Sequence, residues 1–357
     1  MHEEGNLLFS RSIHEENIVG CESLQLDYLK GVGQMRYGVI GTGGMGTQYG
    51  VLLQEFAGKQ VDFIDTWDDN VEQIRKQGGV YVSQDEENRH LVPIHVYYPE
   101  EYDGDPDVWI VFLKQMQLDD VLPRCAHLFK DHQVIFSAMN GYGHFEKFAQ
   151  YFDTSRIYGG TALIGAEVYG PGDVNFTGGA NAKAMNMCGY GEQVTDVEHE
   201  IFEDFTQATL NPTIVSNFMG MCMAKIVFNS VLNTLCTMYQ IRFGEFMRHP
   251  GARWMTEKLV DEAYTAAEKA GLKLLGTRES EVETICHTAG VAHPLHYPSM
   301  YQDLTKGRST EVDFINGYIA TIGRENGYEC TLHEFVTQEL HLAELAFSIH
   351  HPEFKHS

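Results

Sequence analysis

A glycine-rich turn between a short apolar run and a helical run constrains the fold of this chain more than any other feature. The run RYGVI ends at Ile40, G-T-G-G-M-G follows as residues 41–46, TQYGVLLQEFAG comes next, and VDFID ends at Asp65. Strand, glycine turn, helix and strand in this order are typical of a βαβ unit that binds a dinucleotide. The order predicts a Rossmann-type domain that begins near Met35.

Each glycine of this turn has an expected role. Gly41 allows the tight turn, Gly43 lets the backbone approach a pyrophosphate, and Gly46 lets the helix pack closely on the strand. We expect Gly44 and Met45 of the same turn to contact the cofactor too. An incidental glycine-rich turn is the alternative, and the flanking strands and helix disfavour it.

Asp65 ends the second strand of this unit. A carboxylate there can accept both ribose hydroxyls of NAD, and it repels the additional phosphate of NADP. We therefore expect NAD or NADP as the cofactor, with NADH favoured. A solvated turn formed by Asp65, Trp67, Asp68 and Asp69 is the alternative interpretation.

The rest of the chain divides into two compositional parts. Short apolar runs at 108–113, 134–137 and 156–160 predict further strands of a parallel, doubly wound sheet. Long helical periodicity follows about residue 212, over 221–239, 254–270, 311–322 and 334–349. We therefore expect an N-terminal extension over 1–34, a dinucleotide-binding domain over 35–212 and an all-α domain over 213–357. A natural start at Met35 is a further hypothesis.

Charge and cysteine content exclude several kinds of partner. The chain of 357 residues has a formal charge of −25, which repels nucleic acid phosphates and anionic membranes. Its seven cysteines form no C-x-x-C pair, as is typical of reduced thiols. No uninterrupted apolar run approaches the ~20 residues of a membrane helix. We expect a cytoplasmic protein that acts on a small molecule, and the sequence is compatible with a homodimer.

Two groups of polar residues after residue 212 are candidate site residues. Lys225, Asn229 and Asn233 are spaced to share one face of a helix, among apolar neighbours. That face is either an exposed polar stripe or the lining of a cleft, and periodicity does not decide between them. Thr310 and Glu311 could likewise be only a helix-initiating pair.

The histidines invite a metal interpretation. His293 with His296, and His350 with His351, lack a matching carboxylate or cysteine spacing. We expect no metal site.

Three blocks of the sequence together resemble the ketopantoate reductase family. They are the glycine motif, K-x-x-x-N-x-x-x-N over 225–233, and P-S-M-x-Q-D followed by G-R-x-T-E-x-D-x-x-N-G over 298–317. They occur in family order, and the resemblance extends from Met35 to the end of the chain. It implies a reduced nicotinamide cofactor and a 2-oxo acid substrate.

The resemblance also implies roles for residues of these blocks. Lys225 would be the general acid that protonates the ketone oxygen as hydride arrives. Burial would lower the pKa of Lys225 and Glu311 would raise it, and the sequence does not decide between the two. Glu311 and Asn233 would hold hydroxyl or carbonyl groups of the substrate. Ser299 would bind its carboxylate, with support from Asn229.

Further roles follow from the same resemblance. Asp303 is another candidate for substrate binding, and His296 would bind a carboxylate or carbonyl beside Ser299. Asn140, in A-M-N-G-Y-G, resembles the family asparagine near the nicotinamide. Lys114, in F-L-K-Q, resembles the family lysine beside the cofactor.

Three positions depart from the family pattern. His296 and Phe243 stand where the family often has asparagine, and Thr331 replaces the usual proline before the last helix. The first two changes, together with F-I-D-T-W over 63–67, resemble the NAD-dependent D-2-hydroxyacid dehydrogenases of this superfamily more than the NADP-using enzymes of pantothenate biosynthesis.

The sequence therefore predicts an oxidoreductase with its site in the cleft between two domains. The expected reaction is NAD(P)H-dependent reduction of 2-dehydropantoate, or a related branched 2-oxo acid, to the D-2-hydroxy acid. One alternative is a D-2-hydroxyacid dehydrogenase for 2-oxoisocaproate-like or benzoylformate-like acids. Another is a nucleotide-sensing module without turnover.

Overall fold

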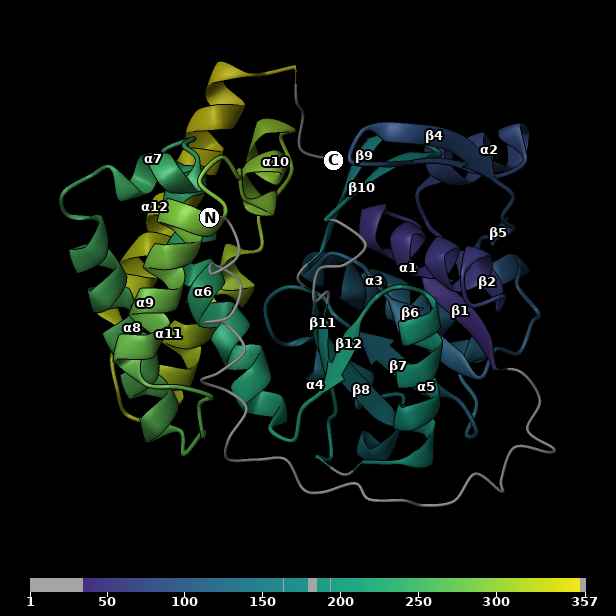
Figure 1. The fold of residues 1–357 in the computed structure, drawn as a ribbon, viewed down its shortest axis with the longest axis horizontal. Helices are drawn as coiled ribbons and strands as arrows, with labels where there is room; N and C mark the ends of the chain where they lie inside the picture. Colours follow the sequence, from purple (N-terminus) through teal and green to yellow (C-terminus); the bar gives the residue numbers. More distant parts are fainter. Residues whose placement is uncertain (1–34, 163, 179–184, 193, 354–357) are drawn as a thin grey trace, which may run out of the picture. The chain divides into compact units, whose positions relative to one another are not determined.

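Two β-sheets precede a group of helices along the chain (Figure 1). The computed structural model describes residues 35–162, 164–178, 185–192 and 194–353. Residues Met35–Ser357 belong to one unit. The extension predicted over 1–34, and the hypothesis of a start at Met35, lie outside what the described residues can address.

The larger sheet carries the glycine turn at the end of its first strand. It has eight strands in the order β12-β11-β8-β7-β6-β1-β2-β5. In chain order they are β1 (Arg36–Ile40), β2 (Gln60–Ile64), β5 (Val96–Tyr97), β6 (Val108–Val111), β7 (Val134–Ser137), β8 (Ile157–Ala162), β11 (Met185–Gly189) and β12 (Pro212–Ile214). Six neighbouring strands of this sheet, β8-β7-β6-β1-β2-β5, pair in parallel. The predicted parallel sheet is therefore confirmed. Only β11 pairs antiparallel, with β8, and β12 then runs parallel to β11.

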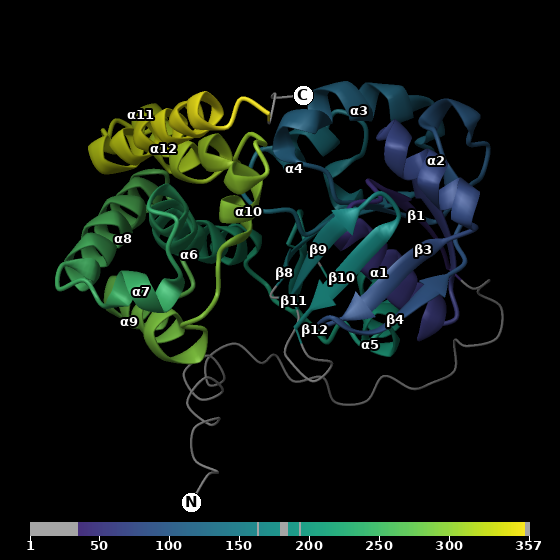
Figure 2. The same cartoon turned by 90° about the horizontal axis from the view of Figure 1, so that it is seen from above.

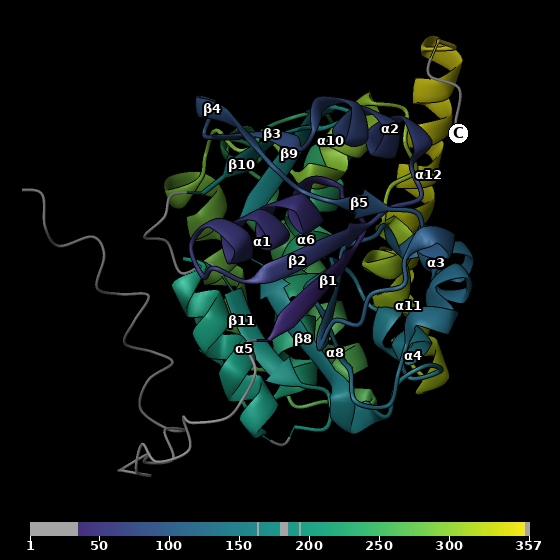
Figure 3. The ribbon, with the colours of Figure 1, turned by 90° about the vertical axis from the view of Figure 1, so that its right-hand side faces the viewer.

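Both faces of this sheet are covered, which explains why its strands are continuously apolar. Val39 of β1 faces one core cluster and Ile40 the other. Helices α1 (Gly44–Glu55) and α5 (Asp196–Gln207) contribute to the first cluster and lie on one side of the sheet (Figure 3). Helix α6 (Phe218–Met238) contributes to the second.

A smaller sheet, which the sequence did not predict, lies beyond α1. Its order is β4-β3-β10-β9, with β3 (Val80–Gln84), β4 (Glu87–Val92), β9 (Gly165–Gly170) and β10 (Asp173–Thr177). Helix α1 contacts strands of both sheets and lies between them (Figure 2). Strand β4 is mostly polar and exposed, so it lacks the alternation of apolar and polar residues that would have identified it.

The helical part confirms three predicted helices and shifts a fourth. Its helices are α6, α7 (Phe243–Met247), α8 (Ala252–Lys269), α9 (Arg278–His287), α10 (Ser299–Thr305), α11 (Asn316–Glu325) and α12 (Thr331–His350). The remaining helices of the described chain are α2 (Asp68–Gln77), α3 (Leu118–Cys125) and α4 (His144–Phe148). The helix expected from Glu311 was predicted too early, because Ile315 has a non-helical backbone (φ −116°, ψ −83°) and α11 begins after it.

Helix α6 is long and apolar enough to be a candidate membrane span, although Lys225 and the polar residues after it interrupt its apolar run. Its 21 residues have a mean hydropathy of 1.3, which would allow a membrane span by length and composition. However, 78% of that segment is buried inside the protein. It is the central core helix of the helical part, and its apolar surface is covered by its neighbours.

Candidate active site

The glycine turn has the geometry that a pyrophosphate needs. Gly41 has φ +95°, and a side chain there would lie 2.3 Å from the carbonyl oxygen of Phe112. A Cβ on Gly46 would lie 2.0 Å from the Gly41 carbonyl oxygen, so helix and strand could not approach as they do. Gly43, the N-cap of α1, has no side-chain cap and nothing within 4 Å of its added Cβ. The open amide groups at this helix start suit a dinucleotide phosphate.

The smaller sheet borders this turn. A Cβ on Gly44 would lie 3.1 Å from the Cβ of Ala166 in β9, and Met45 beside it is half-buried. The two remaining residues of the predicted cofactor turn therefore lie where β9 meets the start of α1.

Asp65 is buried and held in one orientation. Its Oδ1 accepts hydrogen bonds from the backbone amides of Thr66 (2.7 Å) and Trp67 (3.1 Å), and its Oδ2 accepts one from Asn70 Nδ2 (2.9 Å). Burial raises the pKa of Asp65 against the opposing effect of these bonds. The solvated-turn alternative is therefore wrong for Asp65, although Trp67 and the residues that follow it are exposed.

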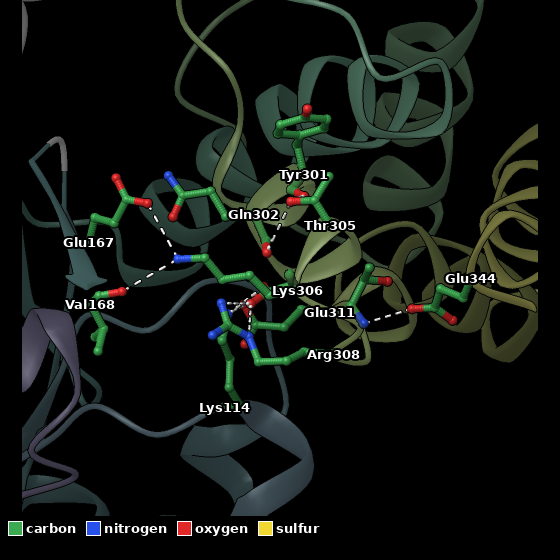
Figure 4. Close-up of polar contacts among 12 residues, drawn as sticks. Lys114, Glu167, Val168, Tyr301, Gln302, Thr305, Lys306, Arg308, Glu311 and Glu344 are labelled. Carbon is green, nitrogen blue, oxygen red and sulfur yellow. Dashed lines mark hydrogen bonds and ion pairs between the residues drawn. The ribbon is translucent and has the colours of Figure 1, made fainter. Parts of the chain in front are cut away.

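An ion-pair network joins the end of β6 to the helical part (Figure 4). Lys114 Nζ lies 2.6 Å from Asp303 Oδ2 and 3.5 Å from Glu311 Oε2. Arg308 Nη2 lies 2.8 Å from the other oxygen of Asp303. Both oxygens of Asp303 are thus engaged by basic side chains, and its contact with substrate stays a prediction.

The charges of this network set the ionisation of its members. Burial lowers the pKa of Lys114, but Glu311 and Asp303 outweigh it and raise the pKa above its usual value. Burial raises the pKa of Glu311, partly offset by Lys114. Glu311 forms no helix-cap hydrogen bond, so the alternative that it only initiates a helix is wrong.

A second ion pair also connects the helical part to the part that contains the sheets. Lys306, just after α10, lies 3.3 Å from Glu167 Oε1 and 3.4 Å from the carbonyl oxygen of Val168, both in β9 (Figure 4). The helical part therefore reaches the strand that borders the glycine turn.

Lys225 is half-buried on α6. Burial lowers its pKa to about 8, and its Nζ lies 5.9 Å from the centre of the Phe228 ring. The sequence left open whether burial or Glu311 dominates this lysine. The carboxylate is paired with Lys114 instead, and burial prevails.

The amides on the same face of α6 are buried. Asn229 and Asn233 are only 2% and 8% exposed, so the exposed-stripe alternative is wrong. Asn229 Nδ2 donates to Asn140 Oδ1 at 3.5 Å, which links α6 to the turn after β7. The cavity beside them is lined by Met139, Gly141, His144, Phe145, Gly160, Thr161, Cys222, Lys225 and Ile226.

Gln115 connects several of these residues, and the sequence analysis missed it. Its Nε2 donates to the Asn140 carbonyl oxygen (2.9 Å), and its backbone amide donates to Glu311 Oε1 (3.4 Å). Its position directly after Lys114, in F-L-K-Q, was the available signal.

Two of the three departures from the family pattern, Phe243 and His296, lie together, and the third, Thr331, begins α12. The Phe243 ring lies 5.0 Å from the His296 ring and 6.3 Å from that of Phe228. The pKa of His296 is lowered by desolvation, then by His293 and Lys225. Ser299 begins α10, which packs on α6. Phe228 and Phe243 therefore form an apolar aromatic wall beside the half-buried Lys225.

Fold and site together define a class of protein. A Rossmann-type sheet with an open glycine turn precedes a helical part that carries a half-buried lysine. This combination is typical of oxidoreductases that bind a nicotinamide cofactor in one part and the substrate in another. Models of the ketopantoate reductase PanE/ApbA family match residues 37–187, and those of its C-terminal part match residues 217–344. The chain belongs to the ketopantoate reductase family, whose members act on a CH–OH group.

Individual relatives agree with this assignment. The 2-dehydropantoate 2-reductase of Lactococcus lactis is 28% identical over 312 residues, which cover 87% of this chain and 98% of the relative. A D-mandelate dehydrogenase, solved with NADH and anilino(oxo)acetate, is 26% identical and has a TM-score of 0.81 over 88% of this chain and 100% of that one. A dimeric ketopantoate reductase of Staphylococcus aureus shares the fold, at 18% identity and a TM-score of 0.71 over 88% of this chain and 100% of that one.

Proposed function

We propose that the protein reduces a 2-oxo acid to the D-2-hydroxy acid, with Lys225 as the general acid. The observation that carries this proposal is the half-buried ammonium of Lys225 at a cavity bordered by the turn after β7 and by β8. Hydride addition to a ketone creates an alkoxide, and an ammonium beside it stabilises the charge and supplies the proton.

The lowered pKa suits this task. A lysine with a pKa of about 8 is still mostly protonated near neutral pH and gives up its proton more readily than an ordinary lysine. The nicotinamide, when bound, supplies the hydride. In this proposal Asn229, Asn233, Glu311 and Ser299 orient the oxo acid.

Residues of the glycine turn and Asp65, directly after β2, would hold the cofactor. Gly41, Gly43 and Gly46 leave room for the pyrophosphate, and Asp65 would accept the ribose hydroxyls. We favour NADH over NADPH because the Asp65 carboxylate is fixed where the additional phosphate would lie. Lys114 and Asn140, at the ends of β6 and β7, would contact the nicotinamide half.

The substrate is either 2-dehydropantoate or a more apolar 2-oxo acid. The aromatic wall of Phe243 and Phe228 favours the second candidate, a branched or aryl 2-oxo acid such as 2-oxoisocaproate or benzoylformate, because an apolar pocket stabilises an apolar side chain. The D-mandelate dehydrogenase relative supports this candidate as well.

One experiment tests the reaction and separates the candidates. NADH and NADPH consumption is followed by absorbance with 2-dehydropantoate, 2-oxoisocaproate and benzoylformate. We expect NADH oxidation with at least one acid and slower oxidation of NADPH. Tight NADH binding without turnover on any acid would favour the nucleotide-sensing alternative.

We also propose that the helical part is a separate domain, which begins after β12 ends at Ile214 and not at residue 213 as expected, and that the protein is a cytoplasmic homodimer. The free cysteines of the described chain support a reducing compartment. The dimeric Staphylococcus aureus relative supports the oligomeric state. Light scattering coupled to size exclusion measures it directly.

A further inference from the structure

His144 is a buried residue to which neither the sequence nor the proposed reaction gives a role. It begins α4, directly after the turn that contains Asn140, and is 1% exposed. Its ring lies 3.8 Å from that of Phe145 and 5.7 Å from that of Phe148. The imidazole is therefore fixed by aromatic packing.

The hydrogen bonds around Gln115 determine which ring nitrogen carries the proton. Gln115 Nε2 lies 2.9 Å from the Asn140 carbonyl oxygen and 2.8 Å from His144 Nδ1. A carbonyl oxygen can only accept, so the amide nitrogen must face it, and its second hydrogen points to His144. Nδ1 is thus an acceptor, and the proton of the neutral ring is on Nε2.

The ring remains neutral under ordinary conditions. Burial lowers the pKa of His144 to about 3, so Nε2 remains a donor of one hydrogen and the ring carries no charge. A neutral donor does not oppose protonation of a nearby lysine, whereas an imidazolium would.

This donor has no acceptor within the described part of the protein. His144 Nε2 is buried without a hydrogen-bond partner. The other deeply buried histidine, His333, differs, since its Nδ1 contacts Asn316 and its Nε2 contacts the Leu259 carbonyl oxygen. Buried polar groups are normally satisfied, so an unpartnered N–H points to a ligand that supplies the acceptor.

The position of His144 indicates what that ligand is. His144 and Lys225 line the same cavity, together with Thr161 and Gly141. Two residues that each carry a donor and line one small cavity suit a single acceptor oxygen on which negative charge develops.

We propose that His144 Nε2–H is a second hydrogen-bond donor to the 2-oxo oxygen of the substrate, beside the ammonium of Lys225. This inference rests on the proposed function. The hydride adds to the carbonyl carbon, the C=O π electrons move to oxygen, and the proton on the product hydroxyl comes from Lys225. His144 keeps its proton throughout and stabilises the oxygen as its charge increases.

The test compares two substitutions of His144. His144→Phe retains an aromatic ring without the donor, and His144→Gln places an amide N–H near the position of Nε2. We expect His144→Phe to lower kcat by about 10²-fold, the usual effect of losing one such donor, with little change in the Kd for NADH measured by fluorescence. His144→Gln should retain more of kcat than His144→Phe.

Two controls separate this role from a structural one. His333→Phe removes a buried histidine of the helical part, and we expect it to lower thermal stability but not kcat per folded molecule. Equal kcat losses in the Phe and Gln variants of His144, or a loss of NADH affinity equal to the loss of kcat, would overturn the inference.

Turnover by the wild-type protein distinguishes failure of the proposed function from failure of the role of His144. If it oxidises NADH with none of the acids, the proposed function fails. If it does turn over and His144→Phe matches it in kcat, only the role of His144 fails.

Discussion

The carboxylate of Glu311 lies 3.5 Å from the ammonium of Lys114. The two lysines of the site therefore differ: Glu311 and Asp303 raise the pKa of Lys114, whereas burial lowers the pKa of Lys225 to about 8. A permanently charged lysine therefore stands at the end of β6, and a titratable one stands on α6. Lys114 is therefore suited to provide a fixed positive charge, and Lys225 is suited to donate a proton.

Removing the amine of Lys225 should abolish most of the turnover. We expect Lys225→Ala to lower kcat by about 10²- to 10⁴-fold, the usual contribution of general acid catalysis. The Kd for NADH should change little. Lys258→Ala, which removes an exposed lysine of α8, is the matched control. A Lys225→Ala enzyme with wild-type kcat would exclude the assigned acid.

The pH dependence should report the lowered pKa of Lys225. Reduction requires the ammonium, so kcat/KM for the oxo acid should be level below the pKa of about 8 and fall above it. Oxidation of the hydroxy acid requires the neutral amine and should show the opposite dependence. Initial rates between about pH 6 and 11 in both directions measure this. A midpoint near the ordinary lysine value of 10.5 would contradict burial as the dominant influence.

Reversing the charge at Asp65 should change the cofactor preference. Asp65→Arg removes the repulsion of the NADP phosphate and adds a guanidinium that can pair with it. The ratio of kcat/KM for NADPH to that for NADH should therefore rise. Asp69→Arg changes the net charge equally at an exposed position and should leave the ratio unaltered. An unchanged ratio in Asp65→Arg would exclude ribose recognition by this carboxylate.

Removing the charge of Asp303 should loosen the connection between the end of β6 and α10. Asp303→Asn leaves Lys114 and Arg308 without their shared partner. We expect a loss of about 1–3 kcal/mol in the free energy of unfolding, less than for a fully buried pair because both cations are partly exposed. Urea denaturation measures it. Glu283→Gln breaks the exposed pair with Arg253 and should have little effect; equal effects would show that the Asp303 network adds no stability.

Local sequence predicted the elements whose signal lies within a few residues. The turn from Gly41 to Gly46 and the periodicity of α6 specify their own conformations, and the structure confirms both. The smaller sheet was missed because β3 acquires its parallel partner β10 from far along the chain, and no local pattern encodes that pairing.

The same distinction applies to the site. The spacing of Lys225, Asn229 and Asn233 placed them on one helix face, but their burial depends on what packs against that face. Pairing of Glu311 with Lys114 instead of Lys225 depends on where β6 and the segment before α11 meet in space. Such contacts between distant segments decide a pKa, and the sequence therefore left its direction open.

The smaller sheet also has a consequence for how the chain is made. Ser83 of β3 and Asn175 of β10, whose side chains are hydrogen-bonded, are 92 positions apart. During synthesis β3 and β4 have only each other as partners until β10 leaves the ribosome, and an isolated two-stranded hairpin has marginal stability. One flank of α1 therefore stays without the completed sheet until about half of the chain has been made. A fragment that stops before β10 should thus be prone to aggregate, even though it contains the whole glycine turn.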